Sequence, residues 1–278
     1  MSQPAASPLL PTIAFIGGGN MASAIIGGLI HQGHPASQIE VVEPWAEARE
    51  ALRKNYGIEA QAEAGPALQR AQIVVWAVKP QTFRDAAAQA KAHTQGALHL
   101  SVAAGIRSDS IAQWLGTERI VRTMPNTPAL VGKGMSALYA RPAVSAPERQ
   151  SIEAIMATTG EFLWVDSEPQ LDAVTALSGS GPAYVFYFLE AMTRAGTDMG
   201  LTAAQAHQLA VGTFVGASEL ARRSDETPAV LRQRVTSKGG TTYAALQSME
   251  HDAVAEKFMQ AMQAARQRAH ELGDEFGK

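Results

Sequence analysis

The 278-residue chain contains no cysteine, which excludes disulfides, thiolate catalysis and metal sites built from cysteine. Charged residues are also few, at 18%, and the net charge of −3 gives no general attraction to nucleic acid or to an anionic membrane surface. No uncharged apolar run is long enough to cross a bilayer. We therefore expect a cytoplasmic protein without a metal site, and neither nucleic acid nor a membrane as its partner.

Hydrophobic residues make up 46% of the chain, which is enough for a large core in one or two domains. Residues 1–11 carry no basic group ahead of an apolar run, so they are predicted to be a loose tail and not a signal peptide. Short β-branched runs alternate with helical patterns up to residue 168, and only helical patterns follow. The sequence thus predicts one domain over residues 12–168 and an all-helical domain over residues 169–278.

A glycine-rich turn separates the apolar run at residues 12–16 from a helical pattern. Gly17 lets the backbone turn sharply, Gly19 lets a pyrophosphate approach the helix start, and Ala22 lets the helix pack closely on the strand. The unpaired N–H groups at the start of such a helix favour negative charge. The spacing matches the dinucleotide-binding fingerprint, and a glycine turn without a ligand is the alternative.

Further strands are predicted at residues 39–43, 73–78, 97–102, 119–123, 135–140 and 161–165. Their alternation with helical stretches indicates a Rossmann-like, doubly wound parallel sheet, in which ligands bind at the carboxyl ends of the strands. The Gly17 turn, Glu43 and the segments 78–80 and 103–105 all fall at those ends. Glu43 is placed to accept hydrogen bonds from the adenosine ribose hydroxyls, and an ordinary solvated strand end is the alternative.

The helical half begins with a serine- and glycine-rich stretch at residues 177–182 and an apolar helix over residues 183–192. Because this helix is apolar on nearly every side, we expect a subunit interface along it, with a core helix inside one protomer as the alternative. Longer helices are predicted over residues 202–222 and 254–272. The hydroxyl- and glycine-rich turn at residues 235–242 precedes another helix and suits a carboxylate, although a well-capped helix would show the same pattern.

Four stretches are the most informative when they are taken together: residues 77–80, 124–128, 172–184 and 237–242. With the glycine turn, they resemble one family over nearly the whole chain, the Δ1-pyrroline-5-carboxylate reductases. The resemblance implies an N-terminal Rossmann domain that holds NADPH or NADH and an all-α C-terminal domain that dimerises by interlocking. It also implies a substrate site between the nicotinamide and the helical domains of two protomers, and homodimers that assemble further into a ring such as a decamer.

Carried over by position, the family's contacts fall on residues of both halves. Its cofactor contacts fall on Gly17, Gly19, Asn20, Met21, Val78, Lys79, Pro80, Ala103, Ala104 and Gly105. Its substrate carboxylate site falls on Ser237, Gly239, Gly240 and Thr241, and its hydroxyl beside the imine nitrogen falls on Thr242. Glu43 departs from the pattern, because many relatives have Asn or Ser near the end of the second strand, some with a basic residue beside it, and a carboxylate would repel the 2′-phosphate of NADPH. Ala64 also departs, since relatives often carry a polar residue near the adenosine.

The reaction that the resemblance implies is hydride transfer from C4 of the nicotinamide to C5 of 1-pyrroline-5-carboxylate, which gives L-proline. Thr242 then holds a hydrogen bond to the ring nitrogen while water completes the proton balance. None of the seven histidines lies in these stretches, so none is assigned a catalytic role. The alternatives are another cyclic-imine reductase, a hydroxyacid dehydrogenase of the same plan, and a non-catalytic dinucleotide-binding sensor. The helix after Pro182 has no lysine before Thr193, which argues against the dehydrogenase.

Overall fold

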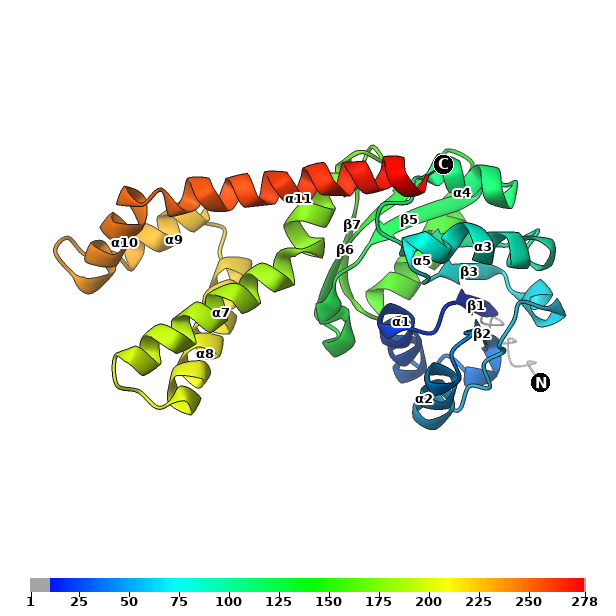
Figure 1. Ribbon diagram of the computed structural model, residues 1–278, viewed down its shortest axis with the longest axis horizontal. Helices are drawn as coiled ribbons and strands as arrows, with labels where there is room; N and C mark the ends of the chain where they lie inside the picture. The colour runs from blue at the N-terminus through cyan, green and yellow to red at the C-terminus, as the bar shows by residue number, and fades with distance from the viewer. Residues whose placement is uncertain (1–10, 278) are drawn as a thin grey trace, which may run out of the picture. The chain divides into compact units, whose positions relative to one another are not determined.

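A computed structural model describes residues 11–277, and the loose tail predicted for residues 1–11 lies, apart from Pro11, outside the described residues. The described residues form a seven-stranded sheet in the order β2-β1-β3-β4-β5-β6-β7 (Figure 1). Its strands are β1 (Ile13–Ile16), β2 (Ile39–Val42), β3 (Ile73–Trp76), β4 (Leu98–Ser101), β5 (Ile120–Met124), β6 (Gly134–Ala140) and β7 (Gly160–Trp164). Each strand that the sequence predicts is therefore present.

The sheet is parallel from β2 to β5, but the prediction of a parallel sheet is wrong at the junction of β5 and β6. These two strands pair antiparallel, and β7 then pairs parallel to β6. Parallel neighbours need a crossover of roughly a dozen residues or more, usually a helix. Residues 125–133 supply only the short turn η4 (Thr127–Val131), so the chain returns directly beside β5.

Helices cover both faces of the sheet, as a doubly wound fold requires. On one face, α1 (Asn20–His31), α2 (Ala46–Tyr56) and α5 (Ala146–Ala157) pack on strand residues such as Phe15 and Val75. The other face carries α3 (Pro80–Ala90) and α4 (Ser108–Leu115), which pack on strand residues such as Trp76. Since β1 and β3 are buried along their whole length, their side chains supply both cores.

The described chain after β7 is helical. It comprises α6 (Gln170–Val174), a π-helical stretch (Thr175–Gly179), α7 (Gly181–Asp198), α8 (Ala203–Arg223), α9 (Pro228–Arg234), α10 (Thr241–His251) and α11 (Val254–Phe276). By contacts the chain forms a sheet unit, residues 1–180 with 265–278, and a helical unit, residues 181–264. α6 contacts β5 and β6, so it belongs to the sheet unit. The predicted domain boundary after residue 168 stays a prediction.

The apolar side chains of α7 are exposed within one chain. Phe186 is 63% exposed and Tyr187 is 70% exposed. The alternative of a core helix inside one protomer is therefore wrong, because a core helix buries such residues. Among the described residues, no helix combines the length and the apolar character needed to cross a membrane.

Candidate active site

The glycine turn after β1 has the geometry that a bound phosphate group requires. Gly17 has a φ of +98°, and a Cβ there would lie 2.5 Å from the carbonyl oxygen of Ala77, so only glycine fits. Gly19 caps α1, and a Cβ built on it would meet nothing within 4 Å, so space lies open before the helix start. No side chain caps α1, and its first N–H groups, beginning with Asn20 and Met21, remain available to an anion.

Glu43 is buried at the end of β2, with 6% of its surface exposed, so the alternative of a solvated strand end is wrong. Its Oε2 accepts a hydrogen bond of 2.7 Å from the N–H of Gly18, and its Oε1 accepts one of 2.9 Å from the N–H of Trp45. A carboxylate has about four acceptor positions, so this one keeps some for a ligand. The predicted contact between Glu43 and a ribose stays a prediction.

Two further predicted cofactor segments lie at the same edge of the sheet as the glycine turn. In the register of the sheet, Ile16 pairs with Trp76, and Trp76 pairs with Ser101, so the three parallel strands end together. Val78, Lys79 and Pro80 follow β3, with Pro80 as the first residue of α3. Ala103, Ala104 and Gly105 follow β4. The structure thus brings Gly17, residues 78–80 and residues 103–105 together.

The loop at residues 103–105 is held by the end of α11. Gly105 has a φ of +72°, and a Cβ there would lie 2.7 Å from the Cβ of Leu272. Nearby, Arg107 pairs with Asp274 at 2.6 Å, and Ser110 Oγ donates to the carbonyl oxygen of Gly277 at 2.6 Å. The last turns of the chain therefore fix the loop that the sequence predicts to face the cofactor.

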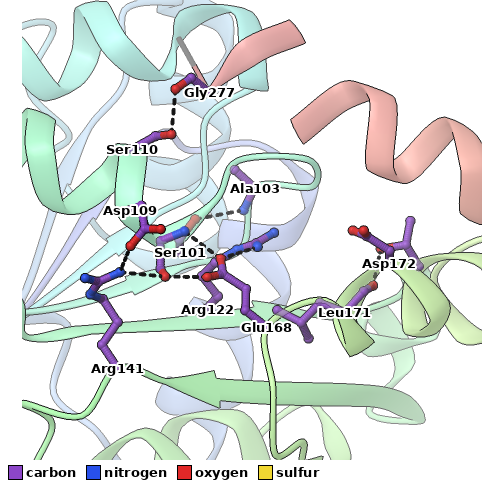
Figure 2. Close-up of polar contacts among 12 residues, drawn as sticks. Ser101, Ala103, Asp109, Ser110, Arg122, Arg141, Glu168, Leu171, Asp172 and Gly277 are labelled. Carbon is purple, nitrogen blue, oxygen red and sulfur yellow. Dashed lines mark hydrogen bonds and ion pairs between the residues drawn. The ribbon is translucent and has the colours of Figure 1, made fainter. Parts of the chain in front are cut away.

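A polar network around the buried side chains of Arg122 and Ser108 was not predicted from the sequence (Figure 2). Glu168 Oε1 accepts from Arg122 Nη1 and from the N–H of Ser108, both at 2.6 Å, and its Oε2 accepts from Ser108 Oγ at 2.5 Å. Arg141 donates to Ser108 Oγ at 3.0 Å and pairs with Asp109. The arginine inside the apolar strand at residues 120–123 was a signal, because a buried guanidinium needs a carboxylate, but its partner is remote in sequence.

The predicted substrate residues lie in the helical unit, at the start of α10. Gly240 is the N-cap of α10, and no side chain caps this helix. The well-capped helix that the sequence left open as an alternative is therefore wrong. Gly239 takes a φ of +75°, and the N–H of Gly240 donates to the carbonyl oxygen of Ser237 at 3.0 Å, which closes the turn. Thr241 and Thr242 open the helix. Its uncapped N–H groups suit a carboxylate.

A cavity of about 550 Å³ lies beside this turn within the helical unit. Its walls come from α9, α10 and the segment between them, and they include Arg232, Lys238 and Glu250. Two cationic side chains and one carboxylate give the cavity an excess of positive charge, which favours an anion. The turn and the cavity thus both favour an anionic ligand.

The histidines stay outside these sites. His99, in β4, is 2% exposed, and burial lowers its pKa to about 4, helped by the charge of Arg119. Its Nδ1 accepts a hydrogen bond of 3.0 Å from Trp76 Nε1, so the ring is neutral and structural. Burial also lowers the pKa of His34. Within residues 11–277, no three His, Asp or Glu side chains are grouped in a way that could hold a metal ion.

Comparison with known proteins agrees with this geometry. The family model described as pyrroline-5-carboxylate reductase dimerisation matches residues 168–272, and the model described as NADP oxidoreductase, coenzyme F420-dependent, matches residues 12–105. A pyrroline-5-carboxylate reductase of Pseudomonas aeruginosa is 44% identical over 270 residues, which cover 96% of this chain and 99% of that protein. The chain belongs to the pyrroline-5-carboxylate reductase family.

Solved pyrroline-5-carboxylate reductases share the fold over nearly their whole length. The structure from Coxiella burnetii is 37% identical with a TM-score of 0.87, and it covers 94% of this chain and 98% of its own. The structure from Plasmodium falciparum, with NADP bound, is 27% identical with a TM-score of 0.86, and the match covers 95% of this chain and 98% of that one.

Family membership settles several predictions. The predicted family and fold class are confirmed, as are the enzyme class, an oxidoreductase acting on a C=N bond, and NADPH or NADH as its cofactor. The chain carries a dimerisation domain of this family. The residues at the edge of the sheet fit a dinucleotide, since the glycine turn leaves open space before the uncapped start of α1. The roles of the individual site residues stay predictions.

Proposed function

We propose that this chain reduces 1-pyrroline-5-carboxylate to L-proline with a reduced nicotinamide cofactor, as the last step of proline biosynthesis. The observation that carries the proposal is a pair of uncapped helix starts, one in each unit. The start of α1 suits a pyrophosphate, and the start of α10 suits the carboxylate of a small acid. The family to which the chain belongs supports the same reaction.

The cofactor is assigned to the sheet unit. Gly17, Gly19, Asn20 and Met21 receive the pyrophosphate at the glycine turn, and Glu43 receives the adenosine ribose. The remaining contacts are assigned to Val78, Lys79, Pro80, Ala103, Ala104 and Gly105. The common position of these segments at one edge of the sheet supports the assignment.

The substrate is assigned to the turn before α10. Ser237, Gly239, Gly240 and Thr241 hold the carboxylate through backbone N–H groups and hydroxyls, and Thr242 holds the ring nitrogen. When bound, the reduced nicotinamide supplies the hydride that adds to C5 of the ring. The protonated imine nitrogen becomes the amine of proline, so the positive charge on nitrogen is neutralised without a strong acid from the protein. Positioning then accounts for much of the rate.

A turnover assay tests the proposal. The purified chain is mixed with 1-pyrroline-5-carboxylate and either NADH or NADPH, and the absorbance of the reduced nicotinamide is followed. We expect oxidation that depends on the substrate, with proline as the product. If neither cofactor is oxidised while both bind, the proposed substrate is wrong, and another cyclic imine takes its place.

We further propose that the active form is a homodimer that assembles into a ring such as a decamer, and that it works in the cytoplasm. The exposed apolar side chains of α7 and the matched dimerisation domain support the dimer. The lack of cysteine supports the compartment, because a chain without disulfides suits a reducing environment. Sedimentation velocity at several protein concentrations measures the assembly, and cell fractionation locates the protein.

A further inference from the structure

The side chain of Trp45 is unusual among the four tryptophans of the chain. It is 71% exposed, whereas Trp76 is fully buried, and Trp114 and Trp164 are partly buried. Trp45 lies two residues after Glu43, at the carboxyl edge of the sheet where a dinucleotide binds. A large aromatic ring in solvent at this place is available to stack on a base.

The backbone of Trp45 is fixed even though its ring is exposed. Its N–H donates to Glu43 Oε1 at 2.9 Å, and its carbonyl oxygen accepts from the N–H of Arg49 at 3.1 Å at the start of α2. Arg49 Nη1 donates to the carbonyl oxygens of Glu43 and Pro44, at 2.9 and 2.7 Å. The segment that carries the ring is therefore held at both ends.

Glu43 joins this segment to the glycine turn. Its carboxylate bridges the N–H of Trp45 and the N–H of Gly18, and it lies beside the backbone of that turn. A Cβ built on Gly18 would lie 3.2 Å from Glu43 Cγ. Ribose hydroxyls can donate to the acceptor positions that remain on the carboxylate, whereas a 2′-phosphate has only acceptors and carries like charge.

We propose that Glu43 and Trp45 together form an adenosine subsite that selects NADH over NADPH. The indole of Trp45 stacks on the adenine, and the carboxylate of Glu43 accepts hydrogen bonds from the ribose hydroxyls and repels a 2′-phosphate. The inference rests on the proposed function only in that the chain binds a nicotinamide dinucleotide. It adds which of the two cofactors the chain prefers, and which side chains decide this.

The first experiment measures binding without turnover. The full chain is titrated with ADP-ribose by calorimetry and by tryptophan fluorescence. We expect ADP-ribose to quench the emission of Trp45. Trp45→Leu should raise the Kd for ADP-ribose about tenfold, and Trp45→Phe should restore most of the affinity because it keeps an aromatic face. Trp164→Phe, at the opposite edge of the sheet, is the matched control and should change neither the Kd nor the quenching. An unchanged Kd in Trp45→Leu would overturn the stacking role.

The second experiment measures selectivity with ADP-ribose and its 2′-phosphorylated form. We expect the unsubstituted chain to bind ADP-ribose at least about tenfold more tightly. Glu43→Ser should reduce this ratio, while thermal unfolding verifies that the variant is folded. Arg49→Met tests for a cationic contribution: it also removes the hydrogen bonds to Glu43 and Pro44, so both Kd values can rise, but their ratio should stay unchanged. A chain that binds the phosphorylated probe more tightly, and loses that preference in Arg49→Met, would overturn the role of Glu43 and assign selectivity to Arg49.

The two proposals fail in different ways. If the chain binds ADP-ribose through Trp45 but never oxidises a cofactor with the imine, the reaction is wrong and the adenosine subsite stands. If the chain turns over the imine while Trp45→Leu and Glu43→Ser leave both Kd values unchanged, the reaction stands and the adenosine subsite is wrong.

Discussion

The two units of the chain differ in how they bury apolar surface. In the sheet unit, side chains as large as Trp76, Phe15 and Phe83 are fully buried. In residues 181–264, all of which the structure describes, the buried residues are Gly196, Ala206 and Ala210, and all are small. The sheet unit is thus stabilised by its own core, whereas the helical unit leaves its large apolar side chains exposed within one chain.

Breaking the buried ion pair of the sheet unit should have the largest effect. Arg122→Met leaves Glu168 without its cation, and we expect the free energy of unfolding to fall by about 3–5 kcal/mol. Arg268→Met, which removes exposed pairs with Glu271 and Glu275, is the control and should cost about 1 kcal/mol or less.

Urea unfolding at two protein concentrations measures both variants. The decrease in the free energy of unfolding in Arg122→Met should be the same at both protein concentrations, because the ion pair lies inside one unit. A loss that disappears at high concentration would contradict the view that the sheet unit is stabilised by itself.

Acid should destabilise the sheet unit through His99. Its pKa in the folded chain is lowered from 6.5 to about 4, so the unfolded chain binds the proton first as the pH falls. The contribution of the neutral ring is present above pH 6.5 and is lost towards pH 4, by up to about 3 kcal/mol. His99→Gln should therefore flatten the fall in unfolding free energy between these pH values, and His251→Gln, at an exposed position, should not. If the unfolding free energy falls equally steeply with pH in the unsubstituted chain, His99→Gln and His251→Gln, this account is contradicted.

A charge on α7 should affect the helical unit through association. Phe186→Asp places a carboxylate in the exposed apolar face, and we expect the dimer Kd to rise at least about 100-fold. Leu163→Asp, at a 45% exposed position of the sheet unit, is the matched control and should leave the Kd unchanged. Sedimentation velocity measures both. A Phe186→Asp protein that remains dimeric at low concentration would show that α7 is not the interface.

The smallest expected effect is on chemistry. Thr242→Ala should lower kcat at least about tenfold, while the Kd for NADH stays unchanged, because we assign the lost hydroxyl to the substrate and not to the cofactor. Thr213→Ala removes a hydroxyl of the same unit that donates within α8, to the carbonyl oxygen of Leu209, and it is the control. Steady-state kinetics and calorimetry separate the two quantities. Unchanged kcat in Thr242→Ala would remove this residue from the proposed mechanism.

The features that the sequence predicted correctly are local ones. The turn at Gly17 is determined by residues next to it, and the buried strands by their own apolar runs, so both could be read directly. The sequence analysis did not predict α9, although Thr227 followed by Pro228 is a typical helix start. In the structure, the Thr227 side chain accepts a hydrogen bond from the N–H of Val230 and caps the helix. The direction of β6 follows from the short connection after β5, and the spacing of the two predicted strands already gave that length, so the antiparallel pairing could have been predicted.

Long-range contacts were beyond the sequence for a different reason. Arg122 and Glu168 are separated by two strands and a helix, and nothing near either residue identifies the other. The burial of Glu43 was likewise hidden, because it depends on the N–H groups of Gly18 and Trp45 in the folded chain. The sequence did predict a subunit interface along α7, because a helix that is apolar on nearly every side is unfavourable in water. The exposure of its apolar side chains within one chain agrees with that prediction.

The contacts of Leu272, Asp274 and Gly277 with residues 105–110 have a consequence for synthesis. A ribosome makes the strands of the sheet unit first, yet residues 265–277, which supply these contacts, are translated only after residues 181–264 of the helical unit. In the nascent sheet unit, residues 105–110 therefore lack these contacts until the whole helical unit has been translated.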